Sequence, residues 1–142
     1  MKKFNYSLSG VLRVRKIQEQ QKRAEVARAI AEKNELSDKI DRLNNEIMAS
    51  KKRLKGAGLV DINDYRLNES YLSGVKVKTE EIVEKIKELD IQIETLKKQL
   101  HQRILETRKL ETHEDKEKQL WREESLREEQ AEFDDIANSR RR

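Results

Sequence analysis

The sequence contains no cysteine, no proline and only four glycines among its 142 residues. The absence of cysteine excludes disulfides and thiolate metal sites. Because proline and glycine are the residues that most often interrupt helices, long uninterrupted helices are expected. No apolar run approaches the ~20 residues that a membrane-spanning helix needs, and no hydrophobic signal segment opens the chain. From these absences we expect a cytoplasmic helical protein.

Aromatic residues are also scarce, at 4% of the chain, whereas charged residues make up 42%. This charged share is far above the roughly 25% of ordinary globular domains, so a compact core of usual size is not expected. Residues 1–55 carry 15 Lys/Arg and 7 Asp/Glu, and residues 56–142 carry 17 and 21. Opposite charge balances in the two parts favour pairing them with each other.

The clearest pattern in the chain is a row of apolar residues whose spacing alternates between four and three. This is the 3.5-residue period of a coiled coil, which keeps one narrow apolar seam facing a partner helix. A second row with similar spacing occurs earlier in the chain, so each row can cover the other. The two rows are Val26, Ala29, Leu36, Ile40, Leu43, Ile47 and Leu54, and then Ile82, Ile86, Leu89, Ile93, Leu96, Leu100 and Leu110.

A short turn separates the two rows. Gly56 and Gly58 suit the left-handed conformation that closes a helix, Asp61 suits the cap of the next helix, and Ser7 suits the cap of the first. A connection this short makes the helices antiparallel neighbours. The sequence therefore predicts an all-α fold, two long helices forming an antiparallel coiled-coil hairpin, with the second helix overhanging the first. We expect residues 1–142 to form a single coiled-coil domain with helix 7–55, turn 56–61, helix 62–138 and a frayed basic tail 139–142.

The expected register leaves the end of the second helix uncovered. If the turn centres near residue 59, facing residue numbers add up to about 118, and the first helix runs out near Leu110. The register also brings Arg15 near Arg103, a conflict unless a carboxylate such as Glu106 intervenes. Trp121 then lies in an overhang of roughly 40 Å, which a rise of ~1.5 Å per residue gives for the remaining helix. Exposed aromatic residues in such an overhang indicate an interaction surface.

The sequence contains no arrangement of residues typical of an active site. It has no glycine-rich phosphate loop and no nucleophile–histidine–acid set, and a two-helix hairpin offers no cleft. His101 and His113 are twelve residues apart, which places them about 120° apart around a helix, so they cannot bind one metal ion from one face. We interpret both as solvated surface residues, and we expect no enzyme activity, no cofactor and no metal.

The two ends of the chain resemble a known family. The beginning reads Phe4-Asn5-Tyr6-Ser7-Leu8-Ser9-Gly10-Val11-Leu12-Arg13-Val14-Arg15, and the end contains Glu132-Phe133-Asp134-Asp135-Ile136-Ala137. The aromatic-x-aromatic-x-Leu-x-x-x-Leu-x-x-Arg opening and the short acidic-apolar-Ala ending are similar to the FliJ family of bacterial flagellar export proteins. The closing motif usually reads Leu-Asp-Glu, and Phe133-Asp134-Asp135 departs from it.

The resemblance implies a soluble, non-enzymatic component of the flagellar type III export apparatus. Proteins of this family form a coiled-coil stalk in the ring of the export ATPase, and they contact the cytoplasmic domain of the export-gate membrane protein. They also assist the cycling of export chaperones. The implied location is the cytoplasm, peripherally associated with the inner face of the cell membrane at the flagellar base. We expect the free protein to be monomeric or only weakly self-associating through the hairpin, although the overhang could pair with a second copy, and we expect no insertion into the membrane.

The same resemblance suggests which residues would contact partners. Those at the end of the hairpin that holds both termini would face the ATPase ring, whereas Tyr65 and Tyr71, near the turn, would face the export gate. The expected ATPase contacts are Phe4, Leu8, Arg13, Arg15, Lys16, Trp121, Arg122, Leu126 and Phe133.

Two other interpretations stay open at this point. The chain has the shape expected of the equivalent stalk in a virulence type III secretion system, although its aromatic opening favours the flagellar one. It could also be a generic structural coiled coil or a basic helix that binds nucleic acid. No aromatic stripe is interleaved with the basic residues, so we do not expect nucleic-acid binding.

Overall fold

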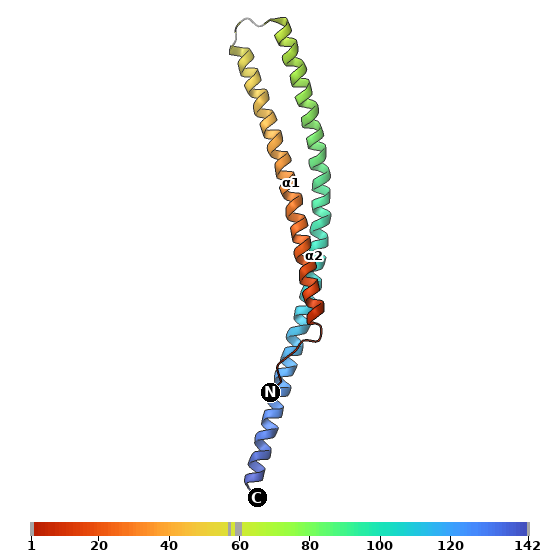
Figure 1. Cartoon of the computed structure of the whole chain (residues 1–142), viewed down its shortest axis with the longest axis vertical. Coiled ribbons are helices and arrows are strands. Elements are labelled where there is room, and N and C mark those ends of the chain that lie inside the picture. Colours follow the sequence, from red (N-terminus) through yellow and green to blue (C-terminus); the bar gives the residue numbers. More distant parts are fainter. Residues whose placement is uncertain (1, 57, 59–60, 142) are drawn as a thin grey trace. The chain divides into compact units, whose positions relative to one another are not determined.

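A computed structural model describes residues 2–56, 58 and 61–141. The described residues form two long helices and no strand: α1 spans Ser9–Gly56, and α2 spans Ile62–Arg140 (Figure 1). The helices pack against each other as a hairpin in which α2 overhangs α1, as the sequence predicts. Neither helix has a stretch long and apolar enough to cross a membrane within the described residues.

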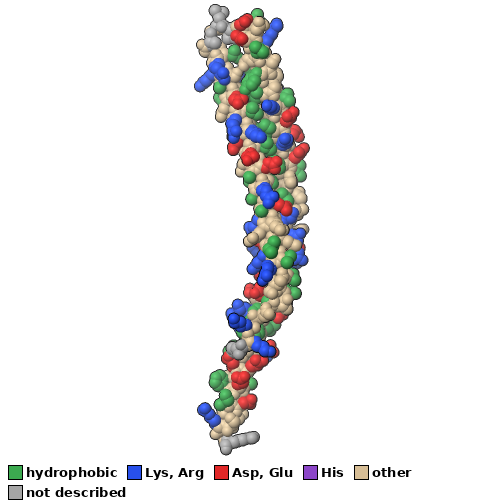
Figure 2. Space-filling model, viewed as in Figure 1, with side chains coloured by type: hydrophobic (Ala, Val, Ile, Leu, Met, Phe, Trp, Pro, Cys, Tyr) green, Lys and Arg blue, Asp and Glu red, His purple; other side chains and the backbone are tan. Residues whose placement is uncertain are grey.

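The contacts divide the chain into two compact units, which we describe separately. The hairpin unit comprises Arg23–Lys98, and the terminal unit comprises Met1–Lys22 together with Gln99–Arg142. Basic and acidic side chains alternate over the visible face of both, with hydrophobic side chains showing between them (Figure 2). This is the surface expected where each helix buries only one stripe.

The start of α1 differs from the sequence prediction by two residues. The N–H of Ser9 donates to the carbonyl of Tyr6 at 3.1 Å, which forms a turn before the helix begins. The N–H of Leu12 donates to the carbonyl of Leu8 at 2.9 Å. Leu8, rather than Ser7, therefore occupies the cap position, because the preceding residues are held in a non-helical segment that packs on α2.

The turn and the start of α2 follow the predicted chemistry. Gly58 has a φ of 70°, the left-handed conformation that favours glycine. The N–H of Tyr65 donates to the backbone carbonyl of Asp61 at 3.0 Å, so Asp61 occupies the predicted cap position of α2. The remaining residues of the predicted turn, 57 and 59–60, lie outside the described residues.

The end of α2 lies beyond the predicted boundary. The helix continues through Ser139 to Arg140 instead of ending at Asn138. The Ser139 hydroxyl donates to the carbonyl of Ile136 at 3.0 Å, a bond that a serine can make inside a helix without ending it. Arg142, the last residue of the predicted frayed tail, lies outside the described residues.

The hairpin unit is built on the predicted apolar seam. Its buried hydrophobic residues are Val26 and Ala29 of α1 and Val75, Leu89 and Ile93 of α2. The other predicted seam residues of this unit are half-buried, which is typical of a two-helix seam with no third element to cover it. These apolar contacts confirm that the rows found in the sequence face each other.

Polar residues also occupy seam positions in the hairpin unit. The Lys33 ammonium lies 2.6 Å from a carboxylate oxygen of Asp90, and the Ser50 hydroxyl donates to the side-chain oxygen of Asn68. The numbers of Ser50 and Asn68 add up to 118, the predicted register, whereas those of Lys33 and Asp90 add up to 123. Lys33 therefore reaches an acidic residue about one helical turn further along α2 than the residue that the predicted register places opposite it.

Candidate partner-binding surfaces

A polar cluster interrupts the apolar seam in the terminal unit, in which Leu12 is buried. One oxygen of the Glu106 carboxylate lies 2.9 Å from the Arg15 guanidinium and 3.5 Å from that of Arg103. Both guanidinium groups also donate to the side-chain oxygen of Gln18, at 3.4 Å and 3.2 Å. Glu106 therefore resolves the predicted conflict between the two arginines. The cluster is half-exposed, so it fixes how the helices pair more than it stabilises them.

The non-helical N-terminal segment is anchored to α2 by Tyr6. Its side chain is 6% exposed, and its hydroxyl lies 2.7 Å from Nδ1 of His113 and 3.4 Å from the carbonyl of Leu110. Desolvation, followed by the negative charges of Glu114 and Glu117, raises the pKa of Tyr6 above its usual value. His113 is an exposed surface residue, as predicted, and it is in addition a hydrogen-bond partner of the N-terminal segment.

The segment reaches further along α2 through Phe4. The rings of Phe4 and Trp121 lie 5.9 Å apart between centroids and are tilted by 54°, a favourable arrangement for two aromatic rings. Alternate residues of an extended segment point to the same side, so the spacing Phe4-x-Tyr6 brings both rings to α2. Trp121 is therefore half-buried, which corrects the expectation that it is an exposed residue of the overhang.

Beyond Trp121, the end of α2 exposes an apolar stripe. Leu126, Phe133 and Ile136 are 64%, 68% and 51% exposed. Residues 123–135 carry seven carboxylates and a single basic residue, and none of these carboxylates forms an ion pair among the described residues. We call this part of α2 the acidic face. It combines exposed hydrophobic area with negative charge, as protein-binding surfaces do.

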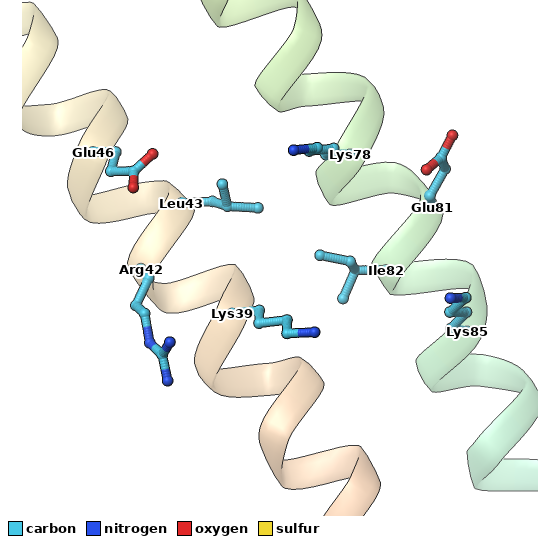
Figure 3. A pocket seen from close by; sticks show the side chains of 8 residues that line it. All are labelled: Lys39, Arg42, Leu43, Glu46, Lys78, Glu81, Ile82 and Lys85. Carbon is cyan, nitrogen blue, oxygen red and sulfur yellow. The ribbon is translucent and has the colours of Figure 1, made fainter.

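The hairpin unit has a groove of about 440 Å³ between its helices. Figure 3 shows Leu43 and Ile82 pointing toward each other across it, and Lys39 and Lys78 projecting into the space between the helices. The groove is lined by Lys39, Arg42, Leu43, Glu46, Lys78, Glu81, Ile82 and Lys85. Four of these eight residues are basic and two are acidic, so the groove suits an amphipathic segment with negative charge.

Tyr71 is linked to this groove through Glu46. The Tyr71 hydroxyl donates to the Glu46 carboxylate at 2.8 Å, and this hydrogen bond is the main cause of a raised Tyr71 pKa. Tyr65, also a predicted gate contact, is exposed in the first turn of α2. The structure thus puts both tyrosines in the hairpin unit, with one of them beside the groove.

The predicted ATPase contacts all belong to the terminal unit, but they do not form one free surface. Arg15 is engaged in the polar cluster, and Phe4 and Trp121 contact each other. Lys16 lies 3.7 Å from Glu111 and is still largely exposed. The predicted contacts that remain exposed are Leu8, Arg13, Lys16, Arg122, Leu126 and Phe133.

Sequence reasoning missed Tyr6 and His113 as an anchoring pair, and it did not single out the groove around Leu43 and Ile82. Tyr6 and His113 are 107 residues apart, and no helical period extends into the N-terminal segment. The alternation of Phe4 and Tyr6 was the one available signal, because it suits an extended segment with one aromatic side. The described residues contain no group of side chains that could hold a metal ion.

Comparison with known proteins supplies the family. Residues 4–142 match the family described as flagellar FliJ protein. The chain belongs to the FliJ family. It is therefore a component of the flagellar type III export apparatus, and the family consists of structural export components rather than known enzymes. No curated protein and no solved structure matched the chain.

Proposed function

We propose that this FliJ-family protein is a non-enzymatic coiled-coil stalk that binds the ring of the export ATPase and couples it to the export gate, assisting chaperone cycling. The observation that carries the proposal is the difference in burial between the hairpin unit and the terminal unit. The hairpin unit holds most of the buried hydrophobic residues, whereas the terminal unit ends in the exposed acidic face. A stalk needs both a stable shaft and an end that recognises the ring.

The acidic face is the part of the chain best suited to the ATPase. Leu126, Phe133 and Ile136 lie seven and three residues apart, so they form one stripe along α2. Aromatic and large aliphatic residues at the centre of an interface contribute most of its binding energy, while the surrounding charges steer the encounter. Phe133 replaces the leucine usual in the closing motif and is the most exposed of the three.

The groove of the hairpin unit supports the proposed contact with the export gate. Its apolar floor and basic rim would accept an amphipathic segment of the gate's cytoplasmic part, and Tyr71 borders it through Glu46. This assignment keeps the two partners on separate units. Binding of one partner would then not exclude the other.

Binding of the purified export ATPase tests the proposal. Because Phe133 is 68% exposed, Phe133→Ala should leave the melting temperature unchanged while weakening ATPase binding by about tenfold or more. Isothermal titration calorimetry gives the affinity, and circular dichroism gives the melting curve. Ile91→Ala is the matched control, since Ile91 is equally exposed, at 70%, but lies in the hairpin unit. Undiminished ATPase binding by Phe133→Ala would remove the acidic face from the ATPase contact.

A further inference from the structure

We propose that two copies of this chain pair through their terminal units, with the acidic face of each copy seated on the start of α1 of the other. The proposal is independent of the proposed function, because it depends only on two surfaces of the terminal unit. One is the acidic face, with Leu126, Phe133 and Ile136 exposed. The other is a hollow on α1, which we call the basic hollow.

The basic hollow measures about 300 Å³ and is lined by Ser9, Leu12, Arg13, Lys16, Ile17 and Gln20. Leu12 is buried and Ile17 is half-exposed, so the hollow offers an apolar surface to a large side chain. Arg13 and Lys16 supply positive charge, and no carboxylate lines the hollow. Arg13 forms no ion pair among the described residues, and so its charge is available to a partner.

The two surfaces complement each other in shape and charge. Phe133 is followed directly by Asp134 and Asp135, so an inserted phenyl ring would carry two carboxylates toward the rim of the hollow. Arginine and lysine at that rim would receive these carboxylates. Like charges would oppose each other if two acidic faces or two basic hollows met directly, so the crossed arrangement is the favoured one.

The spacing of the two surfaces allows a closed pair. Lys16, at the hollow, lies 3.7 Å from Glu111 of α2, and Phe133 is 22 residues further along the same helix. At ~1.5 Å per residue, this separation is about 33 Å. Two antiparallel copies related by a two-fold axis near Arg122 would each place Phe133 on the other's hollow. Such an interface is self-complementary and stops at two copies.

The pairing should be weak and sensitive to salt. Each of its two contact sites is one stripe of a single helix, which is at the small end of protein interfaces. A dissociation constant on the order of 0.1 mM is expected at low ionic strength. Because the charges are exposed, salt at about 0.5 M should screen them and weaken the association. The acidic face cannot hold a second copy and the ATPase at once, so pairing would belong to the protein that is free of ATPase.

Sedimentation equilibrium of the full chain, without any other protein, measures the pairing. Between about 10 µM and about 1 mM the average mass should rise from 16.9 kDa toward twice that value. Phe133→Ser and Ile17→Ser should each weaken association by about tenfold or more. Ile91→Ser is the control and should associate like the parent, because Ile91 is exposed in the hairpin unit. Circular dichroism verifies that every variant keeps its helix content.

A charge exchange makes the test specific to the crossed arrangement. The variant with Arg13→Glu and Lys16→Glu has an acidic hollow, and the variant with Asp134→Lys and Asp135→Lys has a basic stripe end. Each variant alone should stay monomeric, since like charges then meet at both sites. Mixed in equal amounts, the two should associate, because both sites then join opposite charges.

Several results would overturn the pairing. The pairing is contradicted if the parent chain remains monomeric at about 1 mM in low salt. It is also contradicted if the Phe133→Ser and Ile17→Ser variants associate like the parent. A mixture of the two charge variants that stays monomeric would exclude the crossed arrangement. Loss of ATPase binding in variants of a strictly monomeric parent would show that another protein occupies the acidic face. If the parent chain does not bind the ATPase, the proposed function fails, but sedimentation still tests the pairing of two copies. The two proposals can therefore be contradicted independently.

Discussion

The hairpin unit and the terminal unit share the same seven-residue repeat, but different kinds of residue occupy its seam positions. In the hairpin unit, seam positions such as Leu89 and Ile93 are apolar and buried. In the terminal unit, the corresponding positions of the pairing helices include Arg15 and Arg103, which share one carboxylate. Apolar burial contributes far more free energy than half-exposed ion pairs do. The comparison indicates that the hairpin unit provides the stability and that the terminal unit provides the specificity.

The candidate binding surfaces of the two units also differ, in their charge. The groove of the hairpin unit has a basic rim around Leu43 and Ile82, whereas the exposed stripe of the terminal unit is surrounded by carboxylates. Surfaces of opposite charge select different partners and reject one another's. This difference is consistent with the proposed function, in which the two units bind different partners.

The largest effect should come from breaking the seam of the hairpin unit. Leu89→Asp would place a carboxylate without a partner in a buried position, at a cost of about 3 kcal/mol or more. Thermal melting followed by circular dichroism should show a clear fall in melting temperature. Ile91→Asp introduces the same charge two residues away on the exposed side and should melt nearly like the parent. Equal melting of the two variants would mean that the seam lies on another side of α2.

A smaller effect should come from removing the aromatic contact of the terminal unit. Phe4→Ala takes away the ring that packs on Trp121, a pair worth about 1 kcal/mol. The tryptophan emission should shift to the red, because the half-buried indole becomes more exposed to water. The melting temperature should hardly change, since the seam of the hairpin unit is untouched. Tyr65→Ala, in the other unit, should leave the emission maximum in place, and an unshifted maximum in Phe4→Ala would contradict the contact.

Much of the fold could be predicted from the sequence because the pattern that specifies it is local and repeated. The heptad rows, Gly58 and Asp61 together specify two antiparallel helices and the turn between them. The diagonal pairing of Lys33 with Asp90 could not be predicted, because it depends on how these two side chains pack beside the seam. Local patterns determine which elements form, whereas packing determines their exact alignment.

The candidate sites were harder to predict from the sequence than the fold, because some of their contacts join distant residues that no repeat connects. The exposed stripe of Leu126 and Phe133 followed from their positions beyond the end of the first helix. The anchoring of Tyr6 on His113 joins a non-helical segment to a helix across most of the chain, and no repeat connects them. The contact of Trp121 with Phe4 was missed for the same reason, because the two residues are far apart in the sequence and meet only in the folded protein.

Amide hydrogen exchange of the full chain, with and without the export ATPase, tests the central claim most directly. Alone, the amides around Leu89 and Ile93 should exchange most slowly, and those of residues 123–140 should exchange fastest within α2, because most side chains at this end are exposed. Adding the ATPase should slow exchange in residues 123–140 and leave the slow amides near Leu89 unchanged. Protection that appears around Leu89 and not in residues 123–140 would contradict the assignment of stability to one unit and recognition to the other.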